Sequence, residues 1–280
     1  MAKTTTYWSD SDWPPWYIKE GANKGKGISD LTIRYFQDRL KDYDHRLQMQ
    51  SIPRMEQEMV KGQNLICAAD LLKTERRKKF AYFSDLPSMF THPYTVLIKK
   101  DSWKKFSKKN ESLSDFINRN HSLVDLLKNN KIILGINRGH QYLDNQDKIF
   151  KPYLDKKSPN IYVRTGEDVL SGLFSMLMKN RIDYMLGYPL DAEFELQKLN
   201  IREEYLALRI EEALNYDLSY IACTRSKEGK VIIDKINKIL EDDRSKPAYR
   251  EIYERWIGKD ILNSYRRDYN KQYLSISPGI

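Results

Sequence analysis

Hydrophobic and polar positions change their period several times along the first part of the chain. Residues 4–10 alternate polar and large side chains, as in a strand, whereas apolar residues at 28, 31, 33, 36 and 40 follow helical spacing. A strand at 45–50, a short helix at 52–63 that Gly62 ends, and a buried strand at 64–72 are predicted next. This β-α-β-α-β order predicts a parallel sheet with flanking helices.

A second, similar cycle follows a strand at 94–100. Its predicted elements are helices at 112–120 and 122–130, a strand at 131–137, the beginning of a helix at 138–144, a strand at 160–165, a helix at 166–180 and a strand at 181–189 that Pro189 stops. The last predicted elements are a strand at 218–226, helices at 229–243 and 247–258, and a polar tail at 259–280 that is helical in its first half.

Two α/β lobes explain these two cycles. The final strand and helices have no sheet of their own to join, so we expect them to return to the first lobe. The predicted domains are residues 1–95 with 217–280, and residues 96–216. Two crossings of the chain predict a cleft between the lobes, and ligands bind at the carboxyl ends of parallel strands.

Composition narrows the possible functions. The formal net charge is +9, but the 48 Lys and Arg residues are interspersed with 39 acids and form no basic arm, so we expect no nucleic-acid partner. The four histidines are scattered, so we expect neither a metal site nor a cofactor. No apolar run is long enough for a membrane helix, and the first residues carry no signal-peptide core.

The most basic stretch, "TERRKKFAYFSD" at residues 74–85, has three interpretations. It is a solvated helix face, a nucleic-acid patch, or one arginine that points at a ligand while its neighbours face water.

Several motifs, in this order, resemble the type 2 periplasmic solute-binding proteins of the polar amino-acid ABC transporter class, family 3. They are "DWPPW", "GKGISDL", "TERRKKFAYFSD", "LGINRGHQY", "MKNRIDYMLGYP", "DKINKIL" and "YERWIG". The likeness is closer to a subgroup in which the second-lobe strand ends Tyr-Pro. It implies a two-lobed, type II periplasmic-binding-protein-like α/β fold. Each lobe would be a mainly parallel five-stranded sheet flanked by helices, with hinge strands near 94–98 and 214–219.

The same resemblance implies the location of the chain and its binding partners. We expect a monomer in the periplasm, present here as a mature chain without its signal peptide. It would bind a small molecule and dock on an ABC permease or a membrane sensor, closing around its ligand.

In the first lobe the resemblance implies five ligand-binding positions. Alignment by Phe83 and Ser84 makes Arg77 the arginine that grips a carboxylate, with Leu72 in place of a small hydroxyl residue. The other positions are Trp13, either an aromatic wall of the pocket or a core residue, Asp10 on the same rim, and Arg54, which meets an anion or lies in solvent.

In the second lobe the resemblance places Gly139, His140 and Gln141 at a helix N-terminus that would donate backbone N–H groups to a carboxylate. Tyr188 stands where amino-acid binders carry an aspartate for the ligand ammonium. Burial of an unpaired ammonium is costly. We therefore expect an anionic or aromatic ligand rather than a standard amino acid.

Two other functions stay open at this point. Some relatives on this fold are enzymes, such as cyclohexadienyl dehydratases, and Asp10, Asp70 or Asp183 would be the acid that such chemistry needs. The chain would otherwise serve as the ligand-sensing module of a receptor.

The cysteines provide an independent expectation. Cys67 and Cys223 are either a buried reduced pair or a disulfide. In the fold that the resemblance implies, their two strands are neighbours, which makes a disulfide geometrically feasible.

Overall fold

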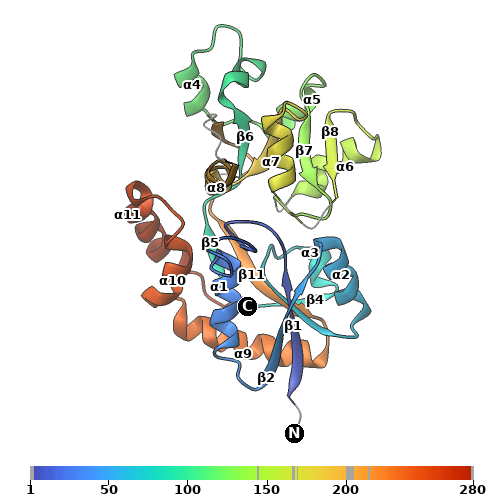
Figure 1. Ribbon diagram of the computed structural model, residues 1–280, viewed down its shortest axis with the longest axis vertical. Helices are drawn as coiled ribbons and strands as arrows, with labels where there is room; N and C mark the ends of the chain where they lie inside the picture. The colour runs from blue at the N-terminus through green and yellow to red at the C-terminus, as the bar shows by residue number, and fades with distance from the viewer. Residues whose placement is uncertain are drawn as a thin grey trace. The chain divides into compact units, whose positions relative to one another are not determined.

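The computed structural model describes residues 3–143, 145–165, 168, 170–199, 205–213 and 215–278 (Figure 1). The chain forms two compact units: unit 1 extends to Thr91 and resumes at Asp217, and unit 2 extends from His92 to Tyr216. The first crossing precedes the hinge segment expected at 94–98, because residues 95–97 already pair within the sheet of unit 2. In the other expected segment, 214–219, residue 214 lies outside the described residues.

The sheet of unit 1 is mixed rather than mainly parallel, and it has six strands rather than five. The strand order is β2-β1-β3-β11-β4, with β5 paired to β11. β1, β2 and β3 are parallel, as the β-α-β-α-β pattern predicts, whereas β11 returns from unit 2 and is antiparallel to all its partners. The strands are β1 (Thr4–Asp10), β2 (Tyr43–Met49), β3 (Leu65–Leu71), β4 (Ala81–Phe83), β5 (Met89–Thr91) and β11 (Asp217–Thr224).

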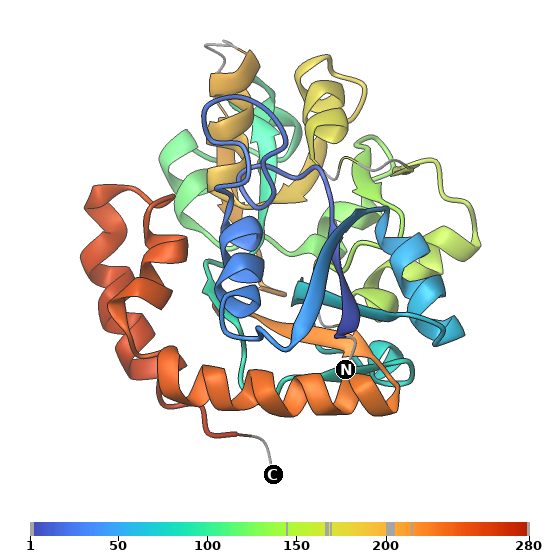
Figure 2. The same ribbon diagram turned by 60° about the horizontal axis from the view of Figure 1, so that its bottom comes forward.

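The helices of unit 1 follow the predicted periodicity closely. α2 ends at Gly62, whose φ of 66° is the left-handed conformation that glycine adopts most easily. α9 buries Ile232, Ile236 and Leu240 along one face, and α10 and α11 continue from its end (Figure 2). The helices are α1 (Ile28–Gln37), α2 (Ile52–Lys61), α3 (Glu75–Lys78), α9 (Lys227–Asp243), α10 (Pro247–Glu254) and α11 (Lys259–Asp268).

A disulfide joins the centre of the unit 1 sheet. Cys67 of β3 and Cys223 of β11 lie directly opposite each other in the antiparallel register, with their Cα atoms 4.1 Å apart. Both residues are fully buried. Of the two states that the sequence left open, the structure has the bonded one.

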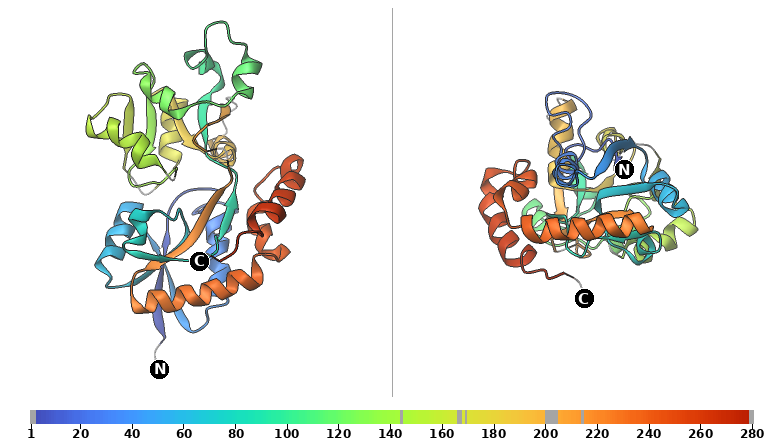
Figure 3. Two further views of the ribbon diagram at one scale, coloured as in Figure 1. Left: turned by 180° about the vertical axis from the view of Figure 1, so that it is seen from behind. Right: turned by 90° about the horizontal axis from the view of Figure 1, so that it is seen from below.

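The C-terminal tail, residues 259–278, is helical well beyond its first half. After α11 it continues as a π-helical segment, Tyr269–Tyr273, and beside β5 and β11 it covers one side of unit 1 (Figure 3). Tyr265, Tyr269 and Tyr273 recur every four residues, so they lie on one face, and all three are buried.

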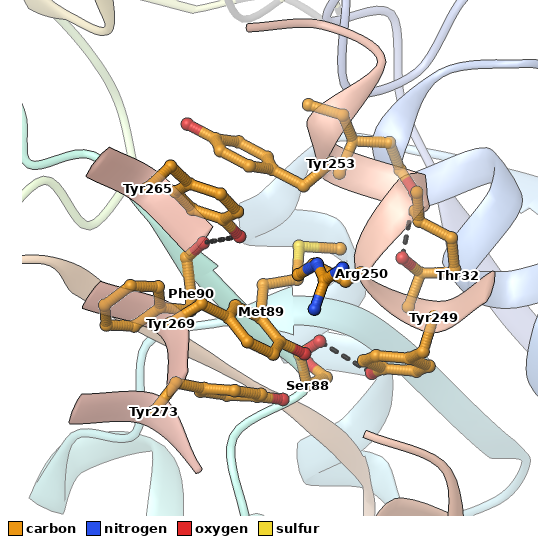
Figure 4. A pocket seen from close by; sticks show the side chains of 12 residues that line it. Thr32, Ser88, Met89, Phe90, Tyr249, Arg250, Tyr253, Tyr265, Tyr269 and Tyr273 are labelled. Carbon is orange, nitrogen blue, oxygen red and sulfur yellow. Dashed lines mark hydrogen bonds between the residues drawn. The ribbon is translucent and has the colours of Figure 1, made fainter. Parts of the chain in front are cut away.

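Backbone carbonyls accept hydrogen bonds from tyrosine hydroxyl groups of the tail and of α10, and Figure 4 shows those from Tyr265 to Phe90 and from Tyr249 to Ser88. Tyr265 donates to Phe90 O at 2.9 Å and Tyr273 to Pro87 O at 2.6 Å. Tyr249 of α10 donates to Ser88 O, also at 2.6 Å. The tail and α10 therefore hold the segment that leads into the first crossing of the chain.

The five-stranded sheet of unit 2 is also mixed, in the order β10-β6-β9-β7-β8. β7 is parallel to β8 and β9, whereas β6 is antiparallel to β9 and β10. The strands are β6 (Thr95–Lys99), β7 (Leu134–Asn137), β8 (Ile161–Arg164), β9 (Tyr184–Gly187) and β10 (Tyr205–Arg209).

Two helices of unit 2 begin later than predicted. α6 (Gln146–Asp155) starts after a turn rather than within residues 138–144, and α7 (Ser171–Met178) starts after residues 166–170, of which 166, 167 and 169 lie outside the described part. Residue 144 also lies outside it. The remaining helices are the 3-10 helix η1 (Lys100–Lys105), α4 (Leu113–Asn118), α5 (Leu123–Lys128) and α8 (Pro189–Leu199).

Candidate functional site

Three polar residues share the carboxyl edge of the parallel strands in unit 1. Asp10 ends β1, Gln50 follows β2, and Asp70 lies near the end of β3. Because these strands run in the same direction, their carboxyl ends meet at one edge of the sheet. A bond from the backbone N–H of Gln50 to Asp10 O, at 3.1 Å, joins two of the strand ends directly.

Asp10 is buried and already has a cation. Lys19 makes an ion pair with it, and Oδ1 accepts a hydrogen bond from Ser11 N at 2.9 Å. Burial raises the pKa of Asp10, and Lys19 offsets this rise only in part. The Asp10 carboxylate is therefore neutralised by an ion pair within unit 1.

Asp70 lies among hydroxyl groups. It accepts hydrogen bonds from Tyr17 and from Ser29, whose Oγ is 2.7 Å from Oδ2. Burial raises the pKa of Asp70, and the two hydroxyl groups and the nearby charge of Arg77 act in the opposite direction. Asp70 is thus a desolvated acid at the edge of the sheet.

Gln50 is a residue that the sequence reasoning missed. Its side chain is 1% exposed, and neither Oε1 nor Nε2 has a hydrogen-bond partner among the described residues. A buried amide without partners costs about 1–3 kcal/mol. No local sequence signal marks Gln50, because its burial depends on the neighbouring strand end.

Trp13 lies in a buried aromatic pair. It is 8% exposed, and its ring centre is 5.1 Å from that of Trp16. Its carbonyl oxygen accepts a hydrogen bond from Tyr17 N at 2.8 Å. The loop that contains two prolines therefore folds back onto unit 1 and brings Tyr17 to Asp70.

Arg77 is buried, as a ligand-binding arginine would be, but it has an internal partner. Its Nε donates to Glu56 Oε1 at 2.9 Å, and Nη1 donates to Leu72 O at 3.3 Å. The structure thus brings Arg77 and Leu72 together. Arg76 donates through both terminal nitrogens to the same carboxylate, at 2.7 and 3.0 Å.

Arg54 does not join this group. It is exposed and pairs with Glu58 one helical turn later, at 3.2 Å. This arrangement matches the solvent-facing interpretation of the two that the sequence left open.

Four aromatic residues of unit 2 form a cluster, hereafter the aromatic cluster: Tyr94, His140, Tyr142 and Tyr188. Tyr94 is its centre, because its ring lies 4.1 Å from Tyr188 and 5.4 Å from Tyr142, and its hydroxyl is 2.8 Å from His140 Nε2. The rings of His140 and Tyr142 are 4.4 Å apart. The cluster connects the carboxyl ends of β7 and β9, so it places two of the predicted site residues together.

The turn at residues 137–142 replaces the helix N-terminus expected there. Gly139 has a φ of 76°, which favours glycine and lets the chain reverse after β7. Tyr142 Oη accepts from Asn137 N at 2.9 Å, which closes the turn. The expectation that a helix dipole begins at these residues is therefore wrong, since α6 starts at Gln146.

Two backbone donors of this turn nevertheless remain available. Among the described residues, the N–H groups of Gly139 and Gln141 donate to no protein acceptor. They lie in the same turn as His140. A ligand acceptor atom beside the aromatic cluster could therefore bind two N–H groups of one short segment.

Tyr188 is followed by an acid that the sequence reasoning also missed. Asp191 is buried, and its Oδ2 accepts from Tyr188 N at 3.1 Å, as a residue that caps the start of α8 does. An acid in the first helical turn, three residues after the residue that precedes the helix, is the weak signal that could have pointed to Asp191.

The acids considered for catalysis have structural partners. Asp183 accepts from Ile133 N at 2.9 Å and pairs with Lys105 at 2.7 Å, so it orders the approach to β9. Among the described residues, no group of three or more His, Cys, Asp or Glu side chains is arranged to hold a metal ion. None of the described helices has the length and apolar character needed to cross a bilayer.

Comparison with protein families gives one match across most of the chain. The model of the bacterial extracellular solute-binding proteins, family 3, matches residues 6–259. No curated protein matched the chain.

Solved structures show the same fold at low sequence identity. An ancestral arginine-binding protein bound to arginine is 19% identical, with a TM-score of 0.65, and covers 92% of this chain and 100% of its own. An arginine transport periplasmic binding protein from Legionella pneumophila is also 19% identical, with a TM-score of 0.60 and coverage of 91% and 100%. A histidine kinase sensor domain similar to periplasmic binding proteins is 14% identical, with a TM-score of 0.62 and coverage of 91% and 96%.

Proposed function

Because the chain belongs to family 3 of the bacterial extracellular solute-binding proteins, we propose that it captures a small anionic or aromatic solute outside the cytoplasm for an ABC permease. The observation that carries this proposal is the aromatic cluster of unit 2, in which Tyr188 and His140 meet through Tyr94. Ring faces and edges bind planar groups well.

The neighbouring turn supports an anionic group on the solute. The N–H groups of Gly139 and Gln141 lack acceptors among the described residues, and two N–H groups in one short turn suit a carboxylate. At the end of β9 the side chain is a tyrosine, and the nearby Asp191 accepts the N–H of Tyr188. This turn therefore offers hydrogen-bond donors to an anion, whereas the tyrosine at the end of β9 offers no charge to an α-ammonium group.

We propose further solute-binding residues in unit 1, taken by itself. Gln50 has unused donors and acceptors for a polar group of a solute. The other residues of unit 1 that we propose for the site are Asp10, Trp13, Leu72 and Arg77, all of them buried. The guanidinium of Arg77 already pairs with Glu56, so an anionic solute would share Arg77 with Glu56.

A thermal-shift screen followed by calorimetry tests the proposal. The panel pairs carboxylates that lack an amino group, such as benzoate and phenylacetate, with arginine, glutamine and phenylalanine. We expect the best ligand to lack an α-amino group, and Tyr188→Ala to weaken it about tenfold or more. Tyr162→Ala is the matched control, because Tyr162 is exposed on β8. Tight binding of an unmodified amino acid with no effect of Tyr188→Ala would refute the proposal.

A role as a sensor module is the second candidate. It is favoured by the similarity in fold to a histidine kinase sensor domain, with a TM-score of 0.62. Deletion of the gene separates the two roles: uptake of the radiolabelled solute falls for a transport component, whereas for a sensor uptake persists and the transcriptional response to the solute disappears.

A further inference from the structure

Unit 2 contains a pocket of about 510 Å³ beneath the turn that follows β7. This volume lies within the range of about 300–1,000 Å³ that is usual for small-molecule sites. The pocket is lined by the end of β7 and its turn (Ile136, Asn137, Arg138, Gly139, His140, Tyr142), by α6 (Phe150, Lys151, Leu154, Asp155), and by Lys157 and Val163.

The floor of this pocket is apolar for a reason that the sheet register explains. Ile136 of β7 and Val163 of β8 are direct partners in a parallel pair, so their side chains lie on the same face of the sheet. Phe150 and Leu154 are one turn apart on α6, so they lie on one face of that helix. Leu154 remains 39% exposed, which shows that apolar surface of α6 is left uncovered here.

Among the described residues that line the pocket, cations outnumber acids. Lys151 pairs with Asp155 on the same helix. Among the described residues, the side chains of Arg138 and Lys157 make neither an ion pair nor a hydrogen bond, and both are exposed. An apolar floor with two uncompensated cations at its rim complements a molecule with an apolar body and one negative charge.

We propose that this pocket binds the ring of a small aromatic monocarboxylate, whose carboxylate is held by Arg138 and Lys157. Phe150 and Tyr142 supply ring surfaces against which an aromatic body packs in offset or edge-to-face geometry. The inference rests on the proposed function, because Gly139 and His140 belong both to the proposed solute site and to the pocket. It narrows the solute class from anionic or aromatic to a ligand that is both.

Fluorine NMR of the full chain with 4-fluorophenylacetate tests the inference, with 4-fluorophenylacetamide as the uncharged control. We expect the carboxylate to bind and the amide to bind at least tenfold more weakly. Val163→Trp fills the pocket and is expected to abolish binding, with circular dichroism to confirm that the variant folds. Arg138→Ser with Lys157→Ser is expected to weaken binding about tenfold, since exposed charge pairs contribute modestly. Lys148→Ser with Lys156→Ser removes the same charge from exposed positions that do not line the pocket and should leave binding unchanged.

The outcomes separate this inference from the proposed function. If Tyr188→Ala abolishes binding of the carboxylate while Val163→Trp and the Arg138/Lys157 variant do not affect it, the pocket assignment is wrong and the proposed function stands. If Val163→Trp abolishes binding and Tyr188→Ala has no effect, the pocket assignment stands without the aromatic cluster. Failure of 4-fluorophenylacetate to bind at millimolar concentration, while another solute from the screen binds, also overturns the pocket assignment.

Discussion

Glu56 accepts a hydrogen bond from the buried guanidinium of Arg77, Nε to Oε1, at 2.9 Å. The same carboxylate is also held by both terminal nitrogens of Arg76. Glu56 thus neutralises the arginine that the family resemblance places in the ligand site. In the basic stretch at residues 74–85, Arg77 is buried, Arg76 is exposed, both pair with Glu56, and the lysines face solvent.

Replacement of each arginine by methionine should separate these two roles. Arg77 is 2% exposed, so Arg77→Met leaves the largely buried Glu56 with only its more exposed partner, and we expect the free energy of unfolding to fall by about 3 kcal/mol. Arg76→Met should cost at most about 1 kcal/mol, because the Arg76 side chain is 45% exposed. Urea unfolding monitored by tryptophan fluorescence measures both, and equal losses would contradict this division.

Glu56 also determines how much Arg77 can contribute to solute binding. A solute carboxylate must compete with Glu56 for the guanidinium, so Glu56→Gln should strengthen binding of an anionic solute about tenfold. Combining it with Arg77→Met should abolish the gain. The measurement is calorimetry with the best carboxylate from the screen, and Glu58→Gln on the same helix is the control. No gain in Glu56→Gln would remove Arg77 from the proposed site.

Asp70 should make the stability of unit 1 depend on pH in the direction opposite to most carboxylates. Its pKa is raised by burial in the folded state, so the folded state binds the proton more tightly than the unfolded state. The stability that it contributes is therefore present at low pH and is lost as the pH rises from the unfolded pKa of about 3.9 through the higher folded value.

Asp70→Asn removes this titration. The unfolding free energy of the variant minus that of the natural chain should consequently become more positive between pH 4 and pH 7, by about 1.4 kcal/mol for each unit by which the pKa is raised. Urea titrations at the two pH values measure this difference. Asp42→Asn is the control, since Asp42 is exposed and should show no such trend. A difference that is constant or falls with pH would contradict the assigned environment.

Long periodic elements could be predicted from the sequence, because their own residues specify them. The apolar face of α9 and the alternation of β1 are examples. β4 and β5 have three residues each, too few to show a period, and they exist because β11 supplies the hydrogen bonds. The start of α6 was placed too early because the glycine turn after β7 looks like the beginning of a helix until Tyr142 is seen to close it.

The candidate site was harder to predict, because its partners are distant in sequence. Glu56 and Arg77 meet only once α2 packs beside β3 and α3. Tyr94 becomes the centre of the aromatic cluster only because β6, which begins at the next residue, pairs with β9. Single motifs therefore drew attention to Tyr188 and His140 but not to Tyr94, which connects them in the structure.

The disulfide should be a strong stabiliser of unit 1. Cys67 and Cys223 are 156 residues apart in sequence, and a cross-link over so long a loop is expected to contribute about 3–5 kcal/mol. The double variant Cys67→Ala with Cys223→Ala should unfold at a correspondingly lower urea concentration. Because both residues are fully buried, a mild reductant should not open the bond in the folded chain. Rapid reduction under native conditions, or an unchanged midpoint in the double variant, would contradict this.

The C-terminal tail should stabilise the segment before the first crossing. The family match ends at residue 259, so Tyr265, Tyr269 and Tyr273 lie beyond it, yet they are buried against Phe90, at ring distances of 5.6–5.9 Å. Tyr273→Phe keeps the ring and removes the bond to Pro87 O, which should cost about 1 kcal/mol. Tyr273→Ala should cost about 3–5 kcal/mol, because it also leaves a cavity.

Hydrogen exchange locates the effect of these substitutions. β5 pairs with β11 at Met89–Thr91, and the tail binds the carbonyl of Phe90 in β5 and that of Pro87 just before it. In Tyr273→Ala the backbone amides of β5 and of β11 at 217–219 should therefore exchange faster than those of β1. Tyr162→Ala should change neither stability nor exchange, since Tyr162 is exposed. A local anchor must protect its own segment most. A uniform rise in exchange across unit 1 would therefore show that the tail stabilises the whole sheet by general burial and does not specifically stabilise the segment before the first crossing.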